Sequence, residues 1–237
     1  MNRLSSMVLS AVLIALPVSA MAAYEGGDVK DGGTISGTVK FKGTAPAPKK
    51  LDVSKDKEVC AKSPKVDQSL IVNNGNLMYA VVTITDIKKG KKIDTKKVTL
   101  DQKECEYHPH VLAFPAGTTV EILNPDGILH NIHSYSKVNS PFNQAQPKFK
   151  KTLDVKIDKP EVIEVKCDVH GWMQGWLVAT ENPYVAVTDN SGSFKLTDVP
   201  AGTYNVEVWH EKLGKTSQKV TVKGKEEAKV NFEMAGK

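Results

Sequence analysis

A thiol, an imidazole and a thioether lie close together in the segment CDVHGWM, residues 167–173. Cys167, His170 and Met173 all carry side chains that bind soft or borderline metals. Copper sites that transfer electrons favour two imidazoles and one thiolate, with a weak thioether on the axis. The segment supplies three of these four ligands, so a copper site needs one more histidine from elsewhere in the chain.

The best candidate for the second imidazole is His130 in NPDGILHNIH, residues 124–133. It lies at the expected start of a strand, directly after a turn that contains proline, aspartate and glycine. Asn131 follows it. We therefore predict copper ligation by four side chains, those of His130, Cys167, His170 and Met173.

Each of these residues also has an ordinary structural explanation. Cys167 could be half of a disulfide, although the adjacent histidine and methionine would then be coincidental. His130 could be a structural histidine, His170 a surface residue and Met173 a core residue. The spacing of His170 and Met173 from Cys167 is what favours the copper hypothesis.

The segments AGTTVEILNPDGILHNIHSYS and EVIEVKCDVHGWMQGWLVA together resemble the cupredoxins, and among these the amicyanins most. That pattern has a Cys-x-x-His-x-x-Met loop and an upstream His-Asn-Val-His, where this chain has HNIH at residues 130–133. The resemblance covers roughly residues 105–180 and implies a Greek-key β-sandwich. It also implies a type 1 (blue) site with one copper per chain that alternates between Cu(I) and Cu(II).

By this resemblance the three equatorial ligands and the axial ligand are His130, Cys167, His170 and Met173. Asn131 matches a residue whose side chain braces the backbone near Cys167, as hydrogen-bonding groups around metal ligands commonly do. Gly171 and Trp172 stand where amicyanin has Pro-Phe, which leaves the reduction potential and solvent access open.

The chain has three cysteines, an odd number for an exported protein, in which two are expected to pair. With Cys167 assigned to copper by the resemblance, Cys60 and Cys105 remain. We expect these two to form a disulfide.

Three further histidines have a less specific context. His108 and His110 alternate along an extended stretch, so they are expected to face the same side. A second metal site there is an alternative to the simpler interpretation that both are partly exposed strand residues. We expect His210 to be a partly exposed strand residue as well.

The chain begins with MNRLSSMVLSAVLIALPVSAMAAYE, which has Arg3, an apolar stretch and then small residues. This pattern is typical of a cleaved secretory signal over residues 1–22, with cleavage after Ala22 or Ala23. The apolar stretch is shorter than the roughly 20 residues that span a bilayer, so no integral membrane segment is expected. We expect a periplasmic or secreted protein.

Short alternating apolar runs bounded by Gly, Pro, Asn and Asp recur along the chain and predict an all-β fold of sandwich type. From Pro183 onward the chain resembles the carboxypeptidase regulatory-like domain, a small transthyretin-type sandwich. Phe194 and the PAGTY turn at residues 200–204 carry this resemblance. The first strands of that family match TISGTVKF and AVVTI, far upstream.

We therefore expect a discontinuous regulatory-like sandwich. Its parts would be residues 33–101 and 183–237, with a cupredoxin domain at residues 102–180 inserted between them. Insertion is tolerated where the cut ends of a domain lie close together.

A copper site with four protein ligands is closed to outside ligands, so one-electron transfer is its natural function. We expect a carrier rather than an enzyme, whose partners are periplasmic redox proteins such as a dehydrogenase, a c-type cytochrome or an oxidase. The resemblance implies that electrons leave through an exposed edge of His170. The alternative is a copper-binding or delivery protein without a redox role.

Two other classes are not expected. A multicopper oxidase needs more than the six histidines of this chain. The 32 basic and 27 acidic residues give a mild positive charge with scattered lysines, which does not favour nucleic acid as a partner.

Overall fold

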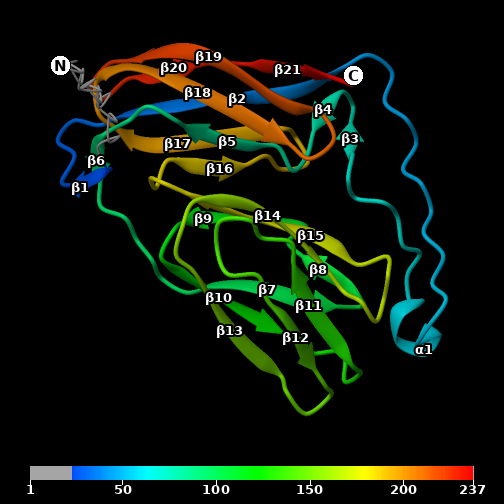
Figure 1. Cartoon of the computed structure of the whole chain (residues 1–237). Helices are drawn as coiled ribbons and strands as arrows, with labels where there is room; N and C mark the ends of the chain where they lie inside the picture. Colours follow the sequence, from blue (N-terminus) through cyan, green and yellow to red (C-terminus); the bar gives the residue numbers. More distant parts are fainter. Residues whose placement is uncertain (1–22, 237) are drawn as a thin grey trace, which may run out of the picture.

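The computed structural model describes residues 23–236, which are almost entirely β-structure with one short helix (Figure 1). The prediction of an all-β fold is confirmed. The signal peptide expected at residues 1–22 lies outside the described residues. Within residues 23–236, the structure contains no helix long and apolar enough to cross a membrane.

One β-sandwich, here called the ligand sandwich, occupies the lower half of Figure 1 and has two sheets. The four-stranded sheet has the order β13 (Thr152–Ile157), β10 (Thr118–Leu123), β7 (Val98–Lys103) and β8 (Glu106–His108). The five-stranded sheet has the order β12 (Asn143–Gln146), β11 (His130–Ser134), β14 (Glu161–Lys166), β15 (Gln174–Thr180) and β9 (Val111–Pro115). Alternate residues of both sheets face inward and share one apolar core, as period-two strands require.

The second sandwich, here called the terminal sandwich, contains strands from both ends of the chain. One sheet has the order β16 (Val185–Val187), β5 (Val81–Ile84), β18 (Gly202–His210) and β19 (Gly214–Val222). The other is built on β2 (Gly33–Lys42), which pairs with β17 (Ser193–Val199), β4 (Asn76–Leu77), β20 (Glu227–Lys229) and β21 (Phe232–Ala235). β3 (Val72–Asn73) pairs with β4, and β1 (Glu25–Gly27) pairs with β6 (Lys89–Lys91).

Strands far apart in sequence therefore lie side by side in the terminal sandwich. Ile35 of β2 is paired with Leu196 of β17, and Val39 with Phe232 of β21. β5 lies between β16 and β18. The chain between β6 and β16 forms the ligand sandwich (Figure 1).

The boundary expected between residues 101 and 102 falls inside a strand. β7 pairs with β10 from Val98 onward, and Leu100 is fully buried in the core of the ligand sandwich. This sandwich therefore begins at Val98, because the apolar alternation of β7 continues through the expected boundary.

Two segments rich in proline and lysine nevertheless contain regular structure. Residues 140–151 include β12, which pairs with β11 at the edge of its sheet. Residues 44–69 include α1 (Lys57–Cys60), and both Cys60 and Lys65 are buried. The second segment is therefore more than a surface connection.

The two sandwiches share a small apolar contact. Val81 of the terminal sandwich packs with Val111 and Val178 of the ligand sandwich. Beside them, the rings of Trp176 and Trp209 meet edge to face with 5.2 Å between their centroids. This geometry is a favourable one for aromatic pairs.

Candidate metal centre

The segment CDVHGWM forms a tight turn between β14 and β15. The backbone N–H of Met173 donates to the carbonyl of His170 at 2.9 Å, and the N–H of Cys167 donates to the carbonyl of Met173 at 3.3 Å. These two bonds fold the segment back on itself. The turn therefore presents Cys167 and His170 toward the same point.

His130 reaches that point from the first position of β11. Its Nδ1 lies 3.0 Å from Nδ1 of His170, and Sγ of Cys167 lies 3.8 Å from the same His170 atom. The potential ligand atoms of the three residues all lie within 4.8 Å of one another. His130 and His170 are fully buried, and Cys167 is 2 % exposed. The structure thus brings two imidazoles and one thiol together in a closed site.

The outer nitrogens of both rings are held by carboxylates. Nε2 of His130 lies 2.9 Å from Asp126, and Nε2 of His170 lies 2.8 Å from Asp56. A carboxylate that accepts a hydrogen bond from Nε2–H fixes the proton on that nitrogen and leaves the Nδ1 lone pair free for a metal. Sequence reasoning missed both aspartates. Asp126 lies in the turn before His130, but Asp56 is 114 residues from its partner and has no local signal.

The surroundings of Cys167 favour its thiolate form. Burial acts to raise the pKa of the thiol, but hydrogen bonds from His130 and His170 outweigh this effect and lower the pKa to about 6. For His130, burial acts to lower the pKa, and Asp126 together with Cys167 raises it. A thiolate is the form of cysteine that binds metals.

Asn131 lies directly behind the thiol and is 6 % exposed. Its Oδ1 accepts a hydrogen bond from the backbone N–H of Asp168 at 2.6 Å and lies 3.4 Å from Sγ of Cys167. Its Nδ2 donates to Asn143 at 2.6 Å. The side chain thus connects β11 to the start of the CDVHGWM turn.

Met173 is 1 % exposed and lies in the same apolar core as Cys167. Its backbone N–H and carbonyl make the two hydrogen bonds that close the turn onto His170 and Cys167. The donor chemistry therefore fits copper, since the site combines two imidazoles, a thiol whose pKa is lowered and a neighbouring buried thioether.

The expectation that His170 has an exposed edge is wrong. The ring is fully buried because Asp56 covers its outer nitrogen and the ring of Trp172 lies beside it, 5.2 Å away between centroids. Asp56 belongs to a segment here called the strap, residues 49–67, which includes α1. The strap leaves the terminal sandwich and reaches the ligand sandwich (Figure 1).

Cys60 of the strap and Cys105 of the β7–β8 turn form a disulfide, with 5.2 Å between their Cα atoms. Both sulfurs lie within 4.8 Å of a ring nitrogen of His170. Cys167 is the free cysteine of the described residues. The disulfide therefore fastens the strap next to the metal centre.

Two of the histidines outside the site, His110 and His210, do not behave as expected. His108 is exposed whereas His110 is buried, so they do not share one environment. Neither belongs to a group of three metal-binding side chains in the described part of the chain. His110 contacts Glu211 of the terminal sandwich, and His210 is 1 % exposed rather than partly exposed. His110 is buried where the two sandwiches meet, which strand alternation does not reveal. His210 instead lies on the same face of β18 as the buried Val206 and Val208, so its burial follows from strand alternation.

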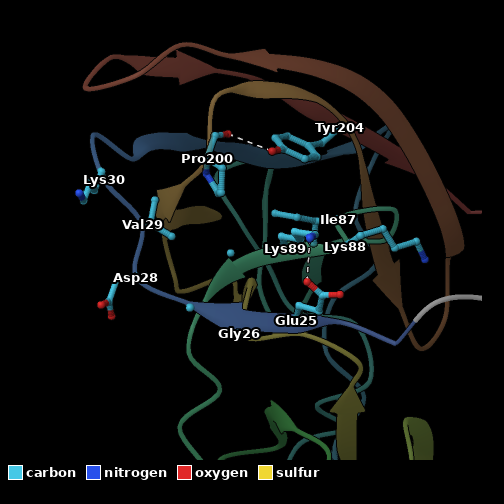
Figure 2. Close-up of a pocket in the computed structure, with 12 residues that line it drawn as sticks. Glu25, Gly26, Asp28, Val29, Lys30, Ile87, Lys88, Lys89, Pro200 and Tyr204 are labelled. Atoms are coloured by element: carbon cyan, nitrogen blue, oxygen red, sulfur yellow. Dashed lines mark hydrogen bonds and ion pairs between the residues drawn. The ribbon is translucent and has the colours of Figure 1, made fainter.

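A pocket of about 490 Å³ lies elsewhere, at the end of the terminal sandwich near β1 and β6 (Figure 2). Two of its lining residues, Glu25 and Lys89, form an ion pair at 2.8 Å, and both side chains are largely exposed (Figure 2). Tyr204 donates to the carbonyl of Pro200 on its far wall. These groups satisfy one another, so we assign no function to this pocket.

A known family matches the C-terminal part of the chain, which supplies most strands of the terminal sandwich. Residues 176–235 match the carboxypeptidase regulatory-like domain. The match begins inside β15, earlier than the start expected at residue 183. β2 and β5 lie outside the matched range but pair with strands of this regulatory-like domain. No curated protein sequence matches the chain at a significant level.

Solved structures similar to part of the chain include copper proteins. A Cu-containing nitrite reductase from Thermus scotoductus is 23 % identical over 39 % of this chain, with a TM-score of 0.35, and the match spans only 24 % of that enzyme. Amicyanin from Paracoccus versutus is 17 % identical over 35 % of this chain and 81 % of its own, with a TM-score of 0.32. A purple cupredoxin from Nitrosopumilus maritimus is 22 % identical over 35 % of this chain and 99 % of its own, with a TM-score of 0.31.

Proposed function

We propose that the protein binds one copper ion per chain through His130, Cys167 and His170, with Met173 on the axis, and carries single electrons. The observation that carries this proposal is the convergence of Nδ1, Nδ1 and Sγ within 4.8 Å in a buried site. Copper held by this donor set supplies a one-electron Cu(I)/Cu(II) couple. The protein fixes the ligands in advance through Asp56, Asp126 and Asn131.

The burial of the site favours electron transfer over catalysis on a bound substrate. Both imidazoles are fully buried and the thiol is 2 % exposed, so a substrate has no open path to the ligand atoms. Catalytic metal sites keep an open position for water or substrate. We therefore propose a carrier and not an enzyme.

A closed site also disfavours copper delivery, the alternative considered from the sequence. Delivery needs a metal that exchanges readily, whereas the outer nitrogen of His170 is covered by Asp56. The partners proposed are periplasmic redox proteins, namely a dehydrogenase on the donor side and a c-type cytochrome or an oxidase on the acceptor side. Export to the periplasm rests on the signal sequence.

Reconstitution with Cu(II) tests this function. The protein without residues 1–22 is mixed with Cu(II), and its visible absorption and copper content are measured. We expect an intense thiolate-to-copper band at one copper per chain, together with reversible one-electron reduction. Copper bound without that band would favour delivery through the histidines, and the absence of tight copper binding would refute the proposal.

A further inference from the structure

The strap is a stretch of chain between two strands of the terminal sandwich that covers a site in the other sandwich (Figure 1). Its two arms pair at the bridge between Lys50 and Val66, with backbone hydrogen bonds beside it. The disulfide between Cys60 and Cys105 fastens its tip to the ligand sandwich. The strap is therefore a closed loop with a fixed end.

A buried lysine anchors the returning arm of the strap. The side chain of Lys65 is fully buried, and its Nζ lies 3.0 Å from Glu106 on β8 and 3.0 Å from Ser63. A buried charge is costly unless it is paired and hydrogen-bonded, so the position of this lysine is tightly determined. Gln68 donates to the same glutamate at 3.0 Å. The strap thus has a second attachment that does not depend on the disulfide.

Asp56 is the strap residue that meets the metal centre. It immediately precedes α1 and has a φ of 48°, a left-handed conformation that is uncommon outside glycine but tolerated by aspartate and asparagine. Its carboxylate lies 2.8 Å from Nε2 of His170, a ring with no solvent exposure. A polar contact on an open surface contributes little, but the Asp56 carboxylate closes over a buried ring.

The second carboxylate, Asp126, is tied to the same disulfide. Besides His130, it accepts hydrogen bonds from the backbone N–H groups of Glu104 and Cys105 at 2.7 and 2.8 Å. The carboxylate that orients one imidazole therefore holds the turn that carries Cys105. The carboxylate that orients the other lies four residues before Cys60.

We propose that Asp56 is a positioning residue for His170 and that the strap is a cover that retains the metal in the centre. The retaining role rests on the copper function proposed above, whereas the positioning role concerns the protein alone. Asp56 keeps the proton on Nε2 and so directs Nδ1 into the site. Exchange of the metal requires His170 to turn or the strap to lift, and the disulfide opposes both movements.

Chemical modification of the metal-free protein tests the positioning role. Diethyl pyrocarbonate modifies accessible imidazoles, and peptide mass spectrometry gives a rate for each histidine. We expect His170 to react much more slowly than the exposed His108. Asp56→Ala should raise the rate at His170 several-fold, whereas Asp56→Asn, which keeps an acceptor oxygen, should restore most of the protection.

Two further variants complete this test. Cys60→Ser/Cys105→Ser should also raise the rate at His170, while Asp52→Ala, an exposed aspartate of the same strap, should leave it at the wild-type value. Amide exchange of β14 shows whether the ligand sandwich stays folded in each variant. Equal rates at His170 in the wild type and in both Asp56→Ala and the double serine variant would overturn the positioning role.

Copper release tests the retaining role. The loaded protein is reduced and mixed with excess bathocuproine disulfonate, and the rate of Cu(I) transfer is measured. We expect Asp56→Ala and the double serine variant to release copper about ten-fold faster or more, as loss of outer hydrogen-bond partners of metal ligands commonly produces. Release at the wild-type rate in both variants would overturn retention.

The reduction potential gives a readout that a purely structural contact would not change. Asp56→Asn removes a negative charge beside a ligand imidazole, so its potential should rise above that of the wild type, while Asp52→Asn should leave it unchanged. If the chain binds no copper, the proposed function and the retaining role both fail. The modification rates of the metal-free protein still decide the positioning of His170.

Discussion

Oδ1 of Asn131 lies 3.4 Å from Sγ of Cys167 and also accepts the backbone N–H of the next residue at 2.6 Å. One side-chain atom thus joins the strand that carries His130 to the turn that carries Cys167 and His170. The distance between the two halves of the metal centre is therefore set by the protein before any metal binds.

Replacement of this side chain should destabilise the metal-free protein. Asn131→Ala removes the acceptor of the N–H of Asp168 in a partly buried position, so the free energy of unfolding should fall by about 0.5–1.5 kcal/mol. Urea unfolding followed by circular dichroism measures the change. Asn73→Ala is the control, because Asn73 is exposed, lies in the terminal sandwich and should have a smaller effect. Equal effects of the two substitutions would show that Asn131 has no special role.

Substitutions of Cys167 and Met173 should change different properties of the copper-loaded protein, namely its visible absorption and its reduction potential. Cys167→Ala removes the thiolate and should abolish the visible charge-transfer band of the copper-loaded protein. Met173→Leu keeps a buried apolar side chain of similar volume, so the band should remain while the reduction potential rises. Absorption spectra and redox titrations measure both. A band that survives Cys167→Ala would exclude the whole copper assignment.

The ring of Trp172 lies beside the ring of His170, with 5.2 Å between their centroids. The Trp172 ring is half-buried, and its Nε1–H donates to the carbonyl of Cys105 at 3.1 Å. Because neither imidazole reaches solvent, electrons must cross protein atoms to leave the site. Trp172→Leu should therefore slow reduction by ferrocyanide in stopped-flow measurements without loss of the visible band, and Trp172→Phe should slow it less. An unchanged rate in the leucine variant would point to another exit, such as the ring of Tyr135 stacked on His133.

His210 should make the folded protein sensitive to acid. Burial is the main cause that lowers the pKa of this histidine from 6.5 to about 4, and its Nε2 has no hydrogen-bond partner in the described part of the chain. As pH falls from 6.5 to 4, His210 becomes protonated in the unfolded chain but not in the folded protein. The free energy of unfolding therefore decreases across this interval.

His210→Asn should reduce that loss, because asparagine does not titrate and can still accept the N–H of Lys212. Unfolding of the metal-free protein in urea at several pH values measures the slope. His108→Asn, at an exposed site, should keep the wild-type slope between pH 6.5 and 4. The hypothesis fails if the two variants show the same dependence on pH.

The sequence contains enough local information to predict the β-fold and the convergence of the ligands. CDVHGWM is a short turn, so the positions of Cys167 and His170 follow from their spacing, and His130 is identifiable because it begins a strand after a turn. The pairing of β2 with β17 depends on contacts over some 160 positions of the chain. Its strand patterns are nevertheless recognisable from the TISGTVKF and SFKLTDV runs.

The cover of the site could not be predicted in this way. Asp56 lies in a Lys-rich stretch with no periodicity, and its contact with His170 exists only because the strap crosses from one sandwich to the other. Contact with Glu211 of the other sandwich likewise buries His110. The burial of His210, in contrast, is recognisable from strand alternation, because this histidine shares the buried face of β18 with Val206 and Val208. Burial at a contact between two domains cannot be recognised from the alternation of apolar residues along either strand.

The path of the strap has a consequence for how this chain can be divided. The carboxylate over His170 and one half of the disulfide come from residues that precede the whole ligand sandwich in sequence. A fragment that begins at Val98 would have every proposed copper ligand, yet His170 would be bare and Cys105 a free thiol. The two sandwiches are therefore not interchangeable modules, and a chimera that exchanges either one must carry the strap with the metal centre to keep that centre sealed.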